Sequence, residues 1–413
     1  MKNVLTQLSK KQISAVFFLF SNAALLCALV LVGAIAPASA QTNRNERYLP
    51  PIATEVPLTW QDDYFPEFRL RISHTDLTSL LTKDEVKGSE TKYPMTLNYQ
   101  GRDFAGTIRR RVPGSSSAGD KKQFRLDFAK KVTFPDGYVA DRFETDHGNG
   151  YTLHEWLAWR MLNQAAERRP DLKILRKKAN VVAIYFNDQL YHVQTLLEDV
   201  NKDLLEPQLG TRKLATFKYG CEALTGASSL DHFCGTFSPA KLQSMMDIPS
   251  FLYATAAMQV LGSFDNYPRL PNNYYFVQET ETERVWFMAD DLDMTFCPYD
   301  PPYSDPFQID YGYWQRHFTD LLQDKVCLEA YYNNVKDLCS LWQPEPLRVA
   351  VDRKYAQVRD TLQACDGLPY GIEYYDYLYQ ESLPLRAEQR FQFLTTLMEE
   401  TNVAAIAEKV ARR

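Results

Sequence analysis

Residues 265–293 decide the fold of this chain, and they read DNYPRLPNNYYFVQETETERVWFMADDLD. Two aromatic runs, 274–277 and 285–289, flank a charged turn and predict an antiparallel hairpin. Because paired strands bring their ends together, the hairpin gathers acids and amides at one end. Oxygen ligands of this kind beside a sheet suit Mg²⁺ or Mn²⁺. The stretch therefore predicts a metal site, and its expected ligands are Asp291, Asp293 and Asn272 or Asn273.

The bulk composition is that of an ordinary globular protein. The chain has 413 residues, of which 45% are hydrophobic and 24% charged, and its net charge is −6. This length accommodates one large domain or two to three ordinary ones. The negative balance argues against a surface that coats nucleic acid, so no nucleic-acid partner is expected.

The first 40 residues have the pattern of an export signal. Lysines precede an apolar run over residues 13–36, and Ala38-Ser39-Ala40 offers a small-x-small site for signal peptidase. We therefore predict cleavage before Gln41 and a periplasmic, cell-surface or secreted protein with no membrane span. The apolar run is long enough to cross a bilayer, so an uncleaved N-terminal anchor is the alternative.

Six cysteines follow the predicted signal peptide. An even number in an exported chain predicts disulfides. Proximity in the sequence favours two local pairs, Cys221 with Cys234 and Cys327 with Cys339. Neither a Cys-x-x-Cys motif nor a histidine cluster has zinc-site spacing, so a structural zinc site is not expected.

The remaining chain divides into a linker and two structural parts. Residues 41–57 are polar and proline-rich, as in a linker. Residues 58–210 carry mostly alternating strand patterns, with one helix at 153–168. Residues 211–413 carry the hairpin and a mostly helical end. This order predicts an α+β fold with two lobes and a site in the cleft between them.

Hydrophobic periodicity and capping residues predict the helices of the second part. Ser250 is the expected cap of a helix over 251–261 that leads to Asp265. Three further helical stretches are expected at 315–342, 346–364 and 385–410.

A small-residue loop in the β-rich part is a candidate phosphate site. Ser116 belongs to this Gly/Ser-rich loop, and the strand that follows opens with Lys121 and Lys122. Backbone N–H groups and cationic side chains in this order can surround a phosphate. The loop matches neither a Walker A motif nor the dinucleotide glycine fingerprint, and an ordinary hairpin with a solvated basic end is the alternative. Glu198, at the end of a later hairpin, could pair with a lysine, bind metal, or simply stand at a helix start.

Four segments together resemble the spore-coat CotH kinases, a secreted atypical branch of the protein-kinase-like fold. The segments are RRRVPGSSS at 109–117 with KKQFRL at 121–126, the hairpin at 184–198, the Asp…Asn-Asn-Tyr-Tyr stretch at 265–275, and MADDLDMTF at 288–296. Their order and spacing make the resemblance specific over about residues 65–300. The chain departs from the family pattern where Asp290 replaces a Trp, where Val112-Pro113 interrupts an Arg-rich strand, and where Tyr191-His192-Val193 replaces Gly-x-Tyr.

The resemblance implies a two-lobed atypical kinase-like fold and a cofactor set of ATP with Mg²⁺ or Mn²⁺. It places Lys121 or Lys122 on the nucleotide phosphates, oriented by Glu198, with Ser116 in the same cofactor-binding group. It also implies that Asp265 accepts or orients the attacking hydroxyl.

The same resemblance implies the substrate class. The expected reaction is transfer of the ATP γ-phosphoryl group to Ser/Thr hydroxyls of surface or envelope proteins, or to a glycan hydroxyl, with Asp291 and Asp293 holding the metal. Because Asp291-Leu292-Asp293 also fits an Asp-x-Asp sugar-nucleotide site, a metal-dependent glycosyltransferase is one alternative. A second alternative is a catalytically inactive pseudokinase that acts in surface assembly. A third is that these acids only belong to a calcium-stabilised loop.

Overall fold

The computed structural model describes residues 56–86, 88–111, 122–146, 150–218, 222–225, 238–263, 265–270, 272–297, 303–307, 316–368 and 370–411. They all belong to one compact unit, Tyr48–Arg413. The predicted signal peptide, most of the linker, Ser116, Lys121 and the Cys221–Cys234 pair lie outside the described residues. A search of the described part of the chain finds no helix with the length and apolarity to cross a membrane.

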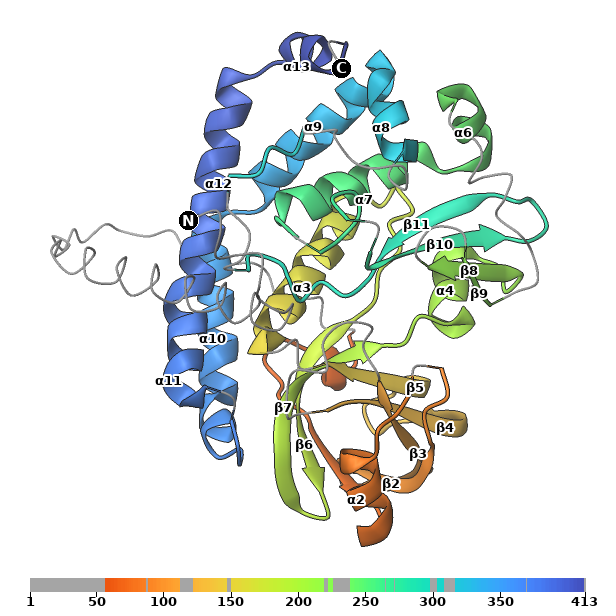
Figure 1. The fold of residues 1–413 in the computed structure, drawn as a ribbon, viewed down its shortest axis with the longest axis vertical. Helices are drawn as coiled ribbons and strands as arrows, with labels where there is room; N and C mark the ends of the chain where they lie inside the picture. The colour runs from red at the N-terminus through yellow and green to blue at the C-terminus, as the bar shows by residue number, and fades with distance from the viewer. Residues whose placement is uncertain are drawn as a thin grey trace, which may run out of the picture. The chain divides into compact units, whose positions relative to one another are not determined.

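Seven strands of the N-terminal part form a closed barrel (Figure 1). Its order is β1 (Glu67–Arg71), β2 (Tyr93–Tyr99), β3 (Arg102–Arg111), β4 (Gln123–Thr133), β5 (Val139–Asp146), β7 (Gln189–Glu198) and β6 (Ala179–Phe186). The barrel closes because β1 pairs in parallel with β6 as well as antiparallel with β2. Alternate side chains fill its interior, among them Phe124, Leu126 and Phe128 of β4.

The predicted hairpin is confirmed as the centre of a second sheet. β10 (Tyr274–Glu279) pairs antiparallel with β11 (Val285–Ala289), with Tyr274 opposite Ala289. β8 (Leu214–Lys218) and β9 (Glu222–Thr225) extend the sheet in the order β11-β10-β8-β9. A parallel bridge between Leu175 and Met288 connects β11 to the segment that leads into β6 of the barrel.

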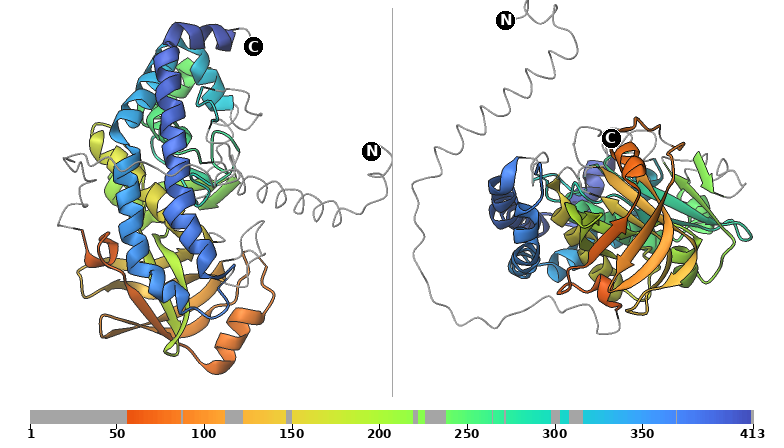
Figure 2. Two further views of the ribbon diagram at one scale, coloured as in Figure 1. Left: turned by 90° about the vertical axis from the view of Figure 1, so that its left-hand side faces the viewer. Right: turned by 90° about the horizontal axis from the view of Figure 1, so that it is seen from below.

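The helices cover the second sheet and one side of the barrel. Their bounds are η2 (Leu58–Trp60), α2 (His74–Thr82), α3 (Thr152–Arg168), α4 (Lys202–Leu209), α6 (Pro239–Met245), α7 (Ile248–Val260), α8 (Arg316–Gln323), α9 (Lys325–Leu341), α10 (Pro344–Gln363), α11 (Gly371–Asp376), the π-helical η5 (Tyr377–Ser382), α12 (Leu383–Glu400) and α13 (Val403–Ala411). The long helices α10 and α12 pack side by side (Figure 2).

Three details of the helix predictions were wrong. The single helix expected over 385–410 is divided into α12 and α13, because Thr401 and Asn402 are not helical. Asp247, not Ser250, caps α7, because Pro249 lies in the first turn and the Asp247 side chain accepts a hydrogen bond from the Ser250 N–H. The single helix expected over 315–342 is split between α8 and α9, where Asp324 caps α9 by accepting from the Cys327 N–H at 3.0 Å.

The buried residues form two hydrophobic cores. One fills the barrel, and the other joins α3, α7, the β10–β11 hairpin and the C-terminal helices. α3 belongs to the second core and also packs on β6 and β7 of the barrel. The predicted α+β class is therefore confirmed, with a closed barrel and a separate four-stranded sheet as its two β components.

The predicted Cys327–Cys339 disulfide is wrong. Both residues lie on α9 and both are free thiols. Twelve residues along a helix separate their Cα atoms by about 18 Å, whereas a disulfide requires Cα atoms within about 7 Å. Sequence proximity predicted the pair, and the helix keeps it apart.

Candidate active site

The two ends of the β10–β11 hairpin meet as the sequence predicted. Asp265 Oδ2 accepts hydrogen bonds from the side-chain amides of Asn272, at 2.9 Å, and Asn273, at 3.3 Å. Asn266 holds the other side, because its amide donates to the backbone carbonyls of Asn273, Asp290 and Asp291 at 2.8–3.2 Å. This cross-linking fixes the loop before β10 against the residues that follow β11.

Three carboxylates from distant parts of the chain form one group. Asp146, Glu155 and Asp291 each offer an oxygen within 4.8 Å of the others. Asp291 is a predicted metal ligand, whereas the sequence analysis missed Asp146 and Glu155. Asp293 is not a member of this group, although the charges of Asp291, Asp146, Glu155 and Asp265 all act on its pKa.

Each acid of the group is positioned by a different element. Asp146 ends β5, Glu155 lies in the first turn of α3, and Asp291 follows β11 with a left-handed backbone, φ 50°. His154, the neighbour of Glu155, lies 2.6 Å from the Thr295 carbonyl oxygen through Nδ1, which attaches α3 to the loop after Asp293. The group thus forms only where the barrel, α3 and the hairpin meet.

The electrostatics of the group favour a bound cation. Burial, followed by the charges of Asp146 and Asp290, raises the pKa of Asp291 to about 7. Burial and the charges of Asp146 and Asp291 raise the pKa of Glu155 well above its usual value. These shifts mean that the carboxylates repel one another in a poorly solvated space.

The donor set fits a divalent metal ion. Glu155 is only 1% exposed, and its Oε2 has no hydrogen-bond partner among the described residues. Such an orphaned buried oxygen carries a desolvation cost unless a ligand satisfies it. Three carboxylates with no nitrogen or sulfur donor suit Mg²⁺ or Mn²⁺.

Asp290, which precedes Asp291, has a different environment. Lys177 Nζ lies 2.7 Å from one carboxylate oxygen and Lys218 Nζ lies 2.7 Å from the other. Although burial alone would raise the pKa of Asp290, the two ammonium groups hold it far below its usual range. Asp290 is therefore a permanently charged counter-ion to two lysines. Because each of its carboxylate oxygens accepts from a lysine, we do not assign Asp290 as a metal ligand.

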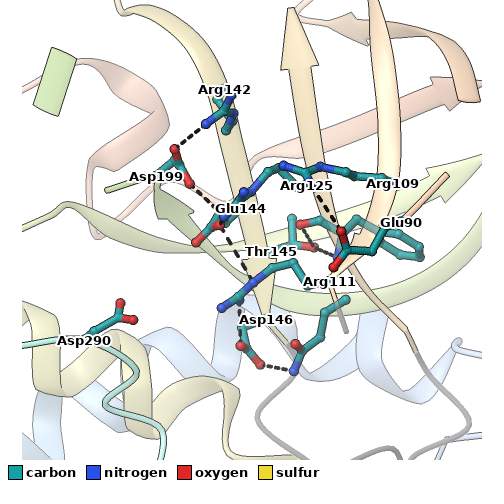
Figure 3. Close-up of polar contacts among 12 residues, drawn as sticks. Glu90, Arg109, Arg111, Arg125, Arg142, Glu144, Thr145, Asp146, Asp199 and Asp290 are labelled. Atoms are coloured by element: carbon teal, nitrogen blue, oxygen red, sulfur yellow. Dashed lines mark hydrogen bonds and ion pairs between the residues drawn. The ribbon is translucent and has the colours of Figure 1, made fainter. Parts of the chain in front are cut away.

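Arginines and carboxylates alternate on the outer face of β3, β4 and β5 (Figure 3). The members of this array are Arg109, Arg111, Arg125, Arg142, Glu90, Asp127, Glu144, Asp146 and Asp199. The arginine side chains are 19–29% exposed and the carboxylates 4–10% exposed, so cationic groups lie above a buried acidic layer.

Arg111 connects this array to the three-carboxylate group. Its Nη1 lies 2.8 Å from Asp146 Oδ2, while Gln123 donates to Asp146 Oδ1 at 2.6 Å. In Figure 3, Asp290 lies on a separate segment, with no contact drawn to the array. Arg111 therefore contacts the three-carboxylate group through Asp146, whereas Lys177 and Lys218 contact Asp290, the residue before Asp291.

The structure describes two of the remaining predicted cofactor residues, Glu198 and Lys122. Glu198 accepts from Lys178 Nζ at 2.9 Å and from the Tyr138 hydroxyl at 2.7 Å, and it lines a cavity of about 450 Å³ with Lys178 and Arg142. The Lys122 carbonyl accepts from Gln194, four residues before Glu198 on β7. Four residues of strand span about 13 Å, so the Lys122 backbone and Glu198 lie at different levels of the barrel.

The residues that the sequence analysis missed had weak local signals. Asp146 ends an alternating strand, and Lys177 and Lys218 flank strands, but no local pattern relates any of them to Asp291. Glu155 lies on a helix that is buried on nearly all sides, so it does not stand out from an apolar stripe. Only the tertiary contacts identify these residues.

Comparison with known proteins bears on this site. Residues 236–390, which contain the hairpin, match the family described as CotH kinase protein, and this confirms the predicted resemblance. Among solved structures, a Helicobacter pylori proinflammatory kinase, CtkA, is similar to 70% of this chain over 94% of its own length, with 11% identity and a TM-score of 0.28. No curated protein matches the chain.

Proposed function

We propose that this chain is a metal-dependent phosphotransferase that moves the γ-phosphoryl group of ATP to a hydroxyl acceptor. The observation that carries the proposal is the group formed by Asp146, Glu155 and Asp291, with Arg111 bound to Asp146 and Lys218 bound to the neighbouring Asp290. The family match over residues 236–390 supports a kinase-like reaction. In this proposal the barrel and the sheet-and-helix part act as the two lobes of a kinase-like cleft.

The acids would hold the metal ion. Asp291 and Asp293, predicted from the sequence, act with Asp146 and Glu155, and Asn272 or Asn273 contributes an amide oxygen. When bound, Mg²⁺ or Mn²⁺ neutralises phosphate oxygens of the nucleotide. Phosphoryl transfer requires this neutralisation and correct positioning more than it requires covalent catalysis.

Asp265 is the proposed acceptor of the substrate proton. Its Oδ2 is held by Asn272 and Asn273, which leaves Oδ1 to orient a hydroxyl. The hydroxyl oxygen forms a bond to the γ-phosphorus, the bond between that phosphorus and the β–γ bridging oxygen breaks, and the hydroxyl proton passes to Asp265. ADP and a phosphorylated acceptor are the products.

The proposed acceptor is a Ser/Thr hydroxyl of a surface or envelope protein, or a glycan hydroxyl. The export pattern of the first 40 residues supports this location, and the alternative is a protein anchored by the same segment. Phosphorylation outside the cytoplasm would then depend on ATP supplied there.

Transfer from γ-labelled ATP tests the proposal. The purified chain is incubated with Mn²⁺ and with envelope extract from the host, and label in protein and in glycan is measured separately. We expect Asp291→Asn to lower transfer at least about 100-fold, since it removes a charged ligand. Asp171→Asn is the control, because Asp171 is exposed at the surface and forms an ion pair with Arg169.

Each alternative predicts a different result in the same assay. Binding of ATP without transfer would indicate a pseudokinase, and release of a sugar from a nucleotide-sugar donor would indicate a glycosyltransferase. Unchanged transfer by Asp291→Asn would contradict the assignment of the site.

A further inference from the structure

A tyrosine-rich segment lies between α10 and α12. It covers residues 370–379, reads YGIEYYDYLY and contains five tyrosines. All but the first of these tyrosines belong to α11 and to the π-helical η5. Because π-helical turns are rare and are frequently found at functional sites, the segment is a candidate for a specific role.

α10 fixes the residue from which η5 begins. Arg359 donates to both carboxylate oxygens of Asp376, at 2.6 and 2.7 Å, and the Tyr355 hydroxyl donates to one of them at 2.9 Å. A bidentate pair between an arginine and a carboxylate is geometrically specific. Asp376 immediately precedes η5, so the π-helical turn starts from a fixed point.

Tyr379 of η5 contacts the turn that leads into α3. Its side chain is completely buried, and its hydroxyl donates to the Gly150 carbonyl and accepts from the Leu153 N–H at 3.5 Å. Gly150 has a φ of 103°, a conformation that favours glycine. Tyr375 packs on the same turn, since a Cβ atom added at Gly150 would lie 3.7 Å from its hydroxyl. Two tyrosines of the C-terminal part therefore hold the start of α3.

The Tyr379 hydroxyl acts as a cap for α3. Helices are usually capped by a Ser, Thr, Asp or Asn side chain at the N-cap position, which is Tyr151 in α3. Tyr379 instead supplies an oxygen to the Leu153 N–H from a distant part of the chain. Burial keeps the pKa of Tyr379 well above its usual value, so the hydroxyl keeps the proton that it donates to Gly150.

The Glu155 carboxylate follows the position of α3 because it is bound to its own helix. Trp159, one turn later, donates from Nε1 to Glu155 Oε1 at 3.4 Å, and Oε2 has no hydrogen-bond partner among the described residues. Leu153 and Glu155 belong to the same helical turn. A shift of this turn would therefore move the Glu155 carboxylate relative to Asp146 and Asp291.

We infer that Tyr379 is a positioning residue that holds Glu155 in place within the metal site. The inference rests on the metal site of the proposed function. Divalent metal ions bind at well-defined distances from their oxygen ligands, so a small displacement of one ligand weakens binding. Without the hydroxyl, the Gly150 carbonyl and the Leu153 N–H lose this partner, and the turn that carries Glu155 relaxes.

Titration of the full chain with Mn²⁺ in the absence of nucleotide, followed by the electron paramagnetic resonance signal of free Mn²⁺, tests the inference. Tyr379→Phe keeps the aromatic ring and is expected to weaken Mn²⁺ binding about tenfold, as the loss of contacts that orient metal ligands commonly does. The double variant of Tyr379→Phe with Glu155→Gln should bind Mn²⁺ within about twofold of Glu155→Gln alone, because the hydroxyl acts through Glu155. A purely structural role would weaken binding equally in both backgrounds.

Tyr332→Phe is the matched control. The Tyr332 hydroxyl also donates to a backbone carbonyl, that of Thr401 at 2.9 Å, but this contact connects α9 to the end of α12. We expect wild-type Mn²⁺ affinity in this variant.

Wild-type Mn²⁺ affinity in Tyr379→Phe would overturn the inference, as would an equal loss in Tyr332→Phe or an undiminished effect in the Glu155→Gln background. Because Mn²⁺ binding is measured without ATP, its outcome is separate from that of the proposed reaction. The expected affinities without phosphoryl transfer would support the positioning role and contradict the reaction. Transfer by the wild type, with unchanged Mn²⁺ affinity in Tyr379→Phe, would support the reaction and contradict the positioning role.

Discussion

Lys177 donates from Nζ to Oδ1 of Asp290 across 2.7 Å, and both side chains are almost completely buried. Lys177 lies just before β6 of the barrel and Asp290 just after β11, so this ion pair connects the barrel to the second sheet. The backbone bridge between Leu175 and Met288 runs beside it. The pair therefore links the barrel to the residue that precedes Asp291.

Removal of one partner of this pair should be costly. Asp290→Leu leaves the Lys177 charge buried without the carboxylate that accepts its hydrogen bond, and we expect the free energy of unfolding to fall by about 3–5 kcal/mol. The double variant Lys177→Met with Asp290→Leu also removes the buried ammonium and should recover the part of this loss that comes from Lys177, whereas the partly exposed Lys218 still lacks Asp290. Urea denaturation of the wild type, both single variants and the double variant measures the coupling. Additive losses would show that the pair does not act as a unit.

Glu155→Gln should change stability in opposite directions with and without metal. In EDTA the variant should be more stable than the wild type by about 1 kcal/mol, because a buried carboxylate that is repelled by Asp146 and Asp291 becomes neutral. With Mn²⁺ in excess the wild type should gain the larger rise in melting temperature, since binding stabilises the folded state. Thermal denaturation in the two buffers measures both effects.

Glu167→Gln is the control for this experiment. Glu167 is exposed near the C-terminal end of the same helix and should not respond to Mn²⁺. A Glu155→Gln variant that keeps the full metal-induced rise in melting temperature would exclude Glu155 from the metal site.

The hairpin could be predicted because its information is local. Two aromatic runs, a short charged turn and the acids at the ends lie within residues 265–293. The extent of α3 was predicted for the same reason, since helix periodicity is read over a few residues.

The partners of Asp291 could not be predicted because they are brought in by non-local contacts. Asp146 lies 145 positions before Asp291 in the chain, and its place depends on the closed barrel. That closure requires the parallel pairing of β1 with β6, which no sequence pattern specifies. Lys177 and Lys218 likewise reach Asp290 only through long-range packing.

The free thiols of α9 give a chemical test of the helix. Cys327 and Cys339 should both be alkylated by iodoacetamide in denaturant without prior reduction, because they do not form a disulfide. Peptide mass mapping with and without reductant reports each residue separately. Protection of both residues until reductant is added would contradict the separation that α9 imposes.

Lys354 on α10 is buried against the start of the described chain. Its Nζ donates to the backbone carbonyls of Asp62, at 2.8 Å, and Tyr64, at 3.2 Å. Burial lowers the pKa of Lys354 to about 7, opposed in part by the charges of Asp62 and Asp63 and reinforced by Arg160. The amine is therefore neutral in the folded protein at mildly alkaline pH, whereas in the unfolded chain it stays protonated up to about pH 10.4.

This difference predicts that Lys354 makes stability rise with pH above neutrality. Below about pH 7 both states carry the proton and this group contributes no slope. Between about pH 7 and pH 10 the unfolded chain binds more protons than the folded protein, so the free energy of unfolding increases with pH. Lys354→Met is the reference, because it keeps every other titrating group of the wild type. Between pH 7 and pH 9 the free energy of unfolding of the wild type, measured by urea denaturation, should rise by about 2 kcal/mol relative to that of Lys354→Met. A constant difference between the two proteins over this range would mean that the buried amine stays charged, held by the carbonyls of Asp62 and Tyr64.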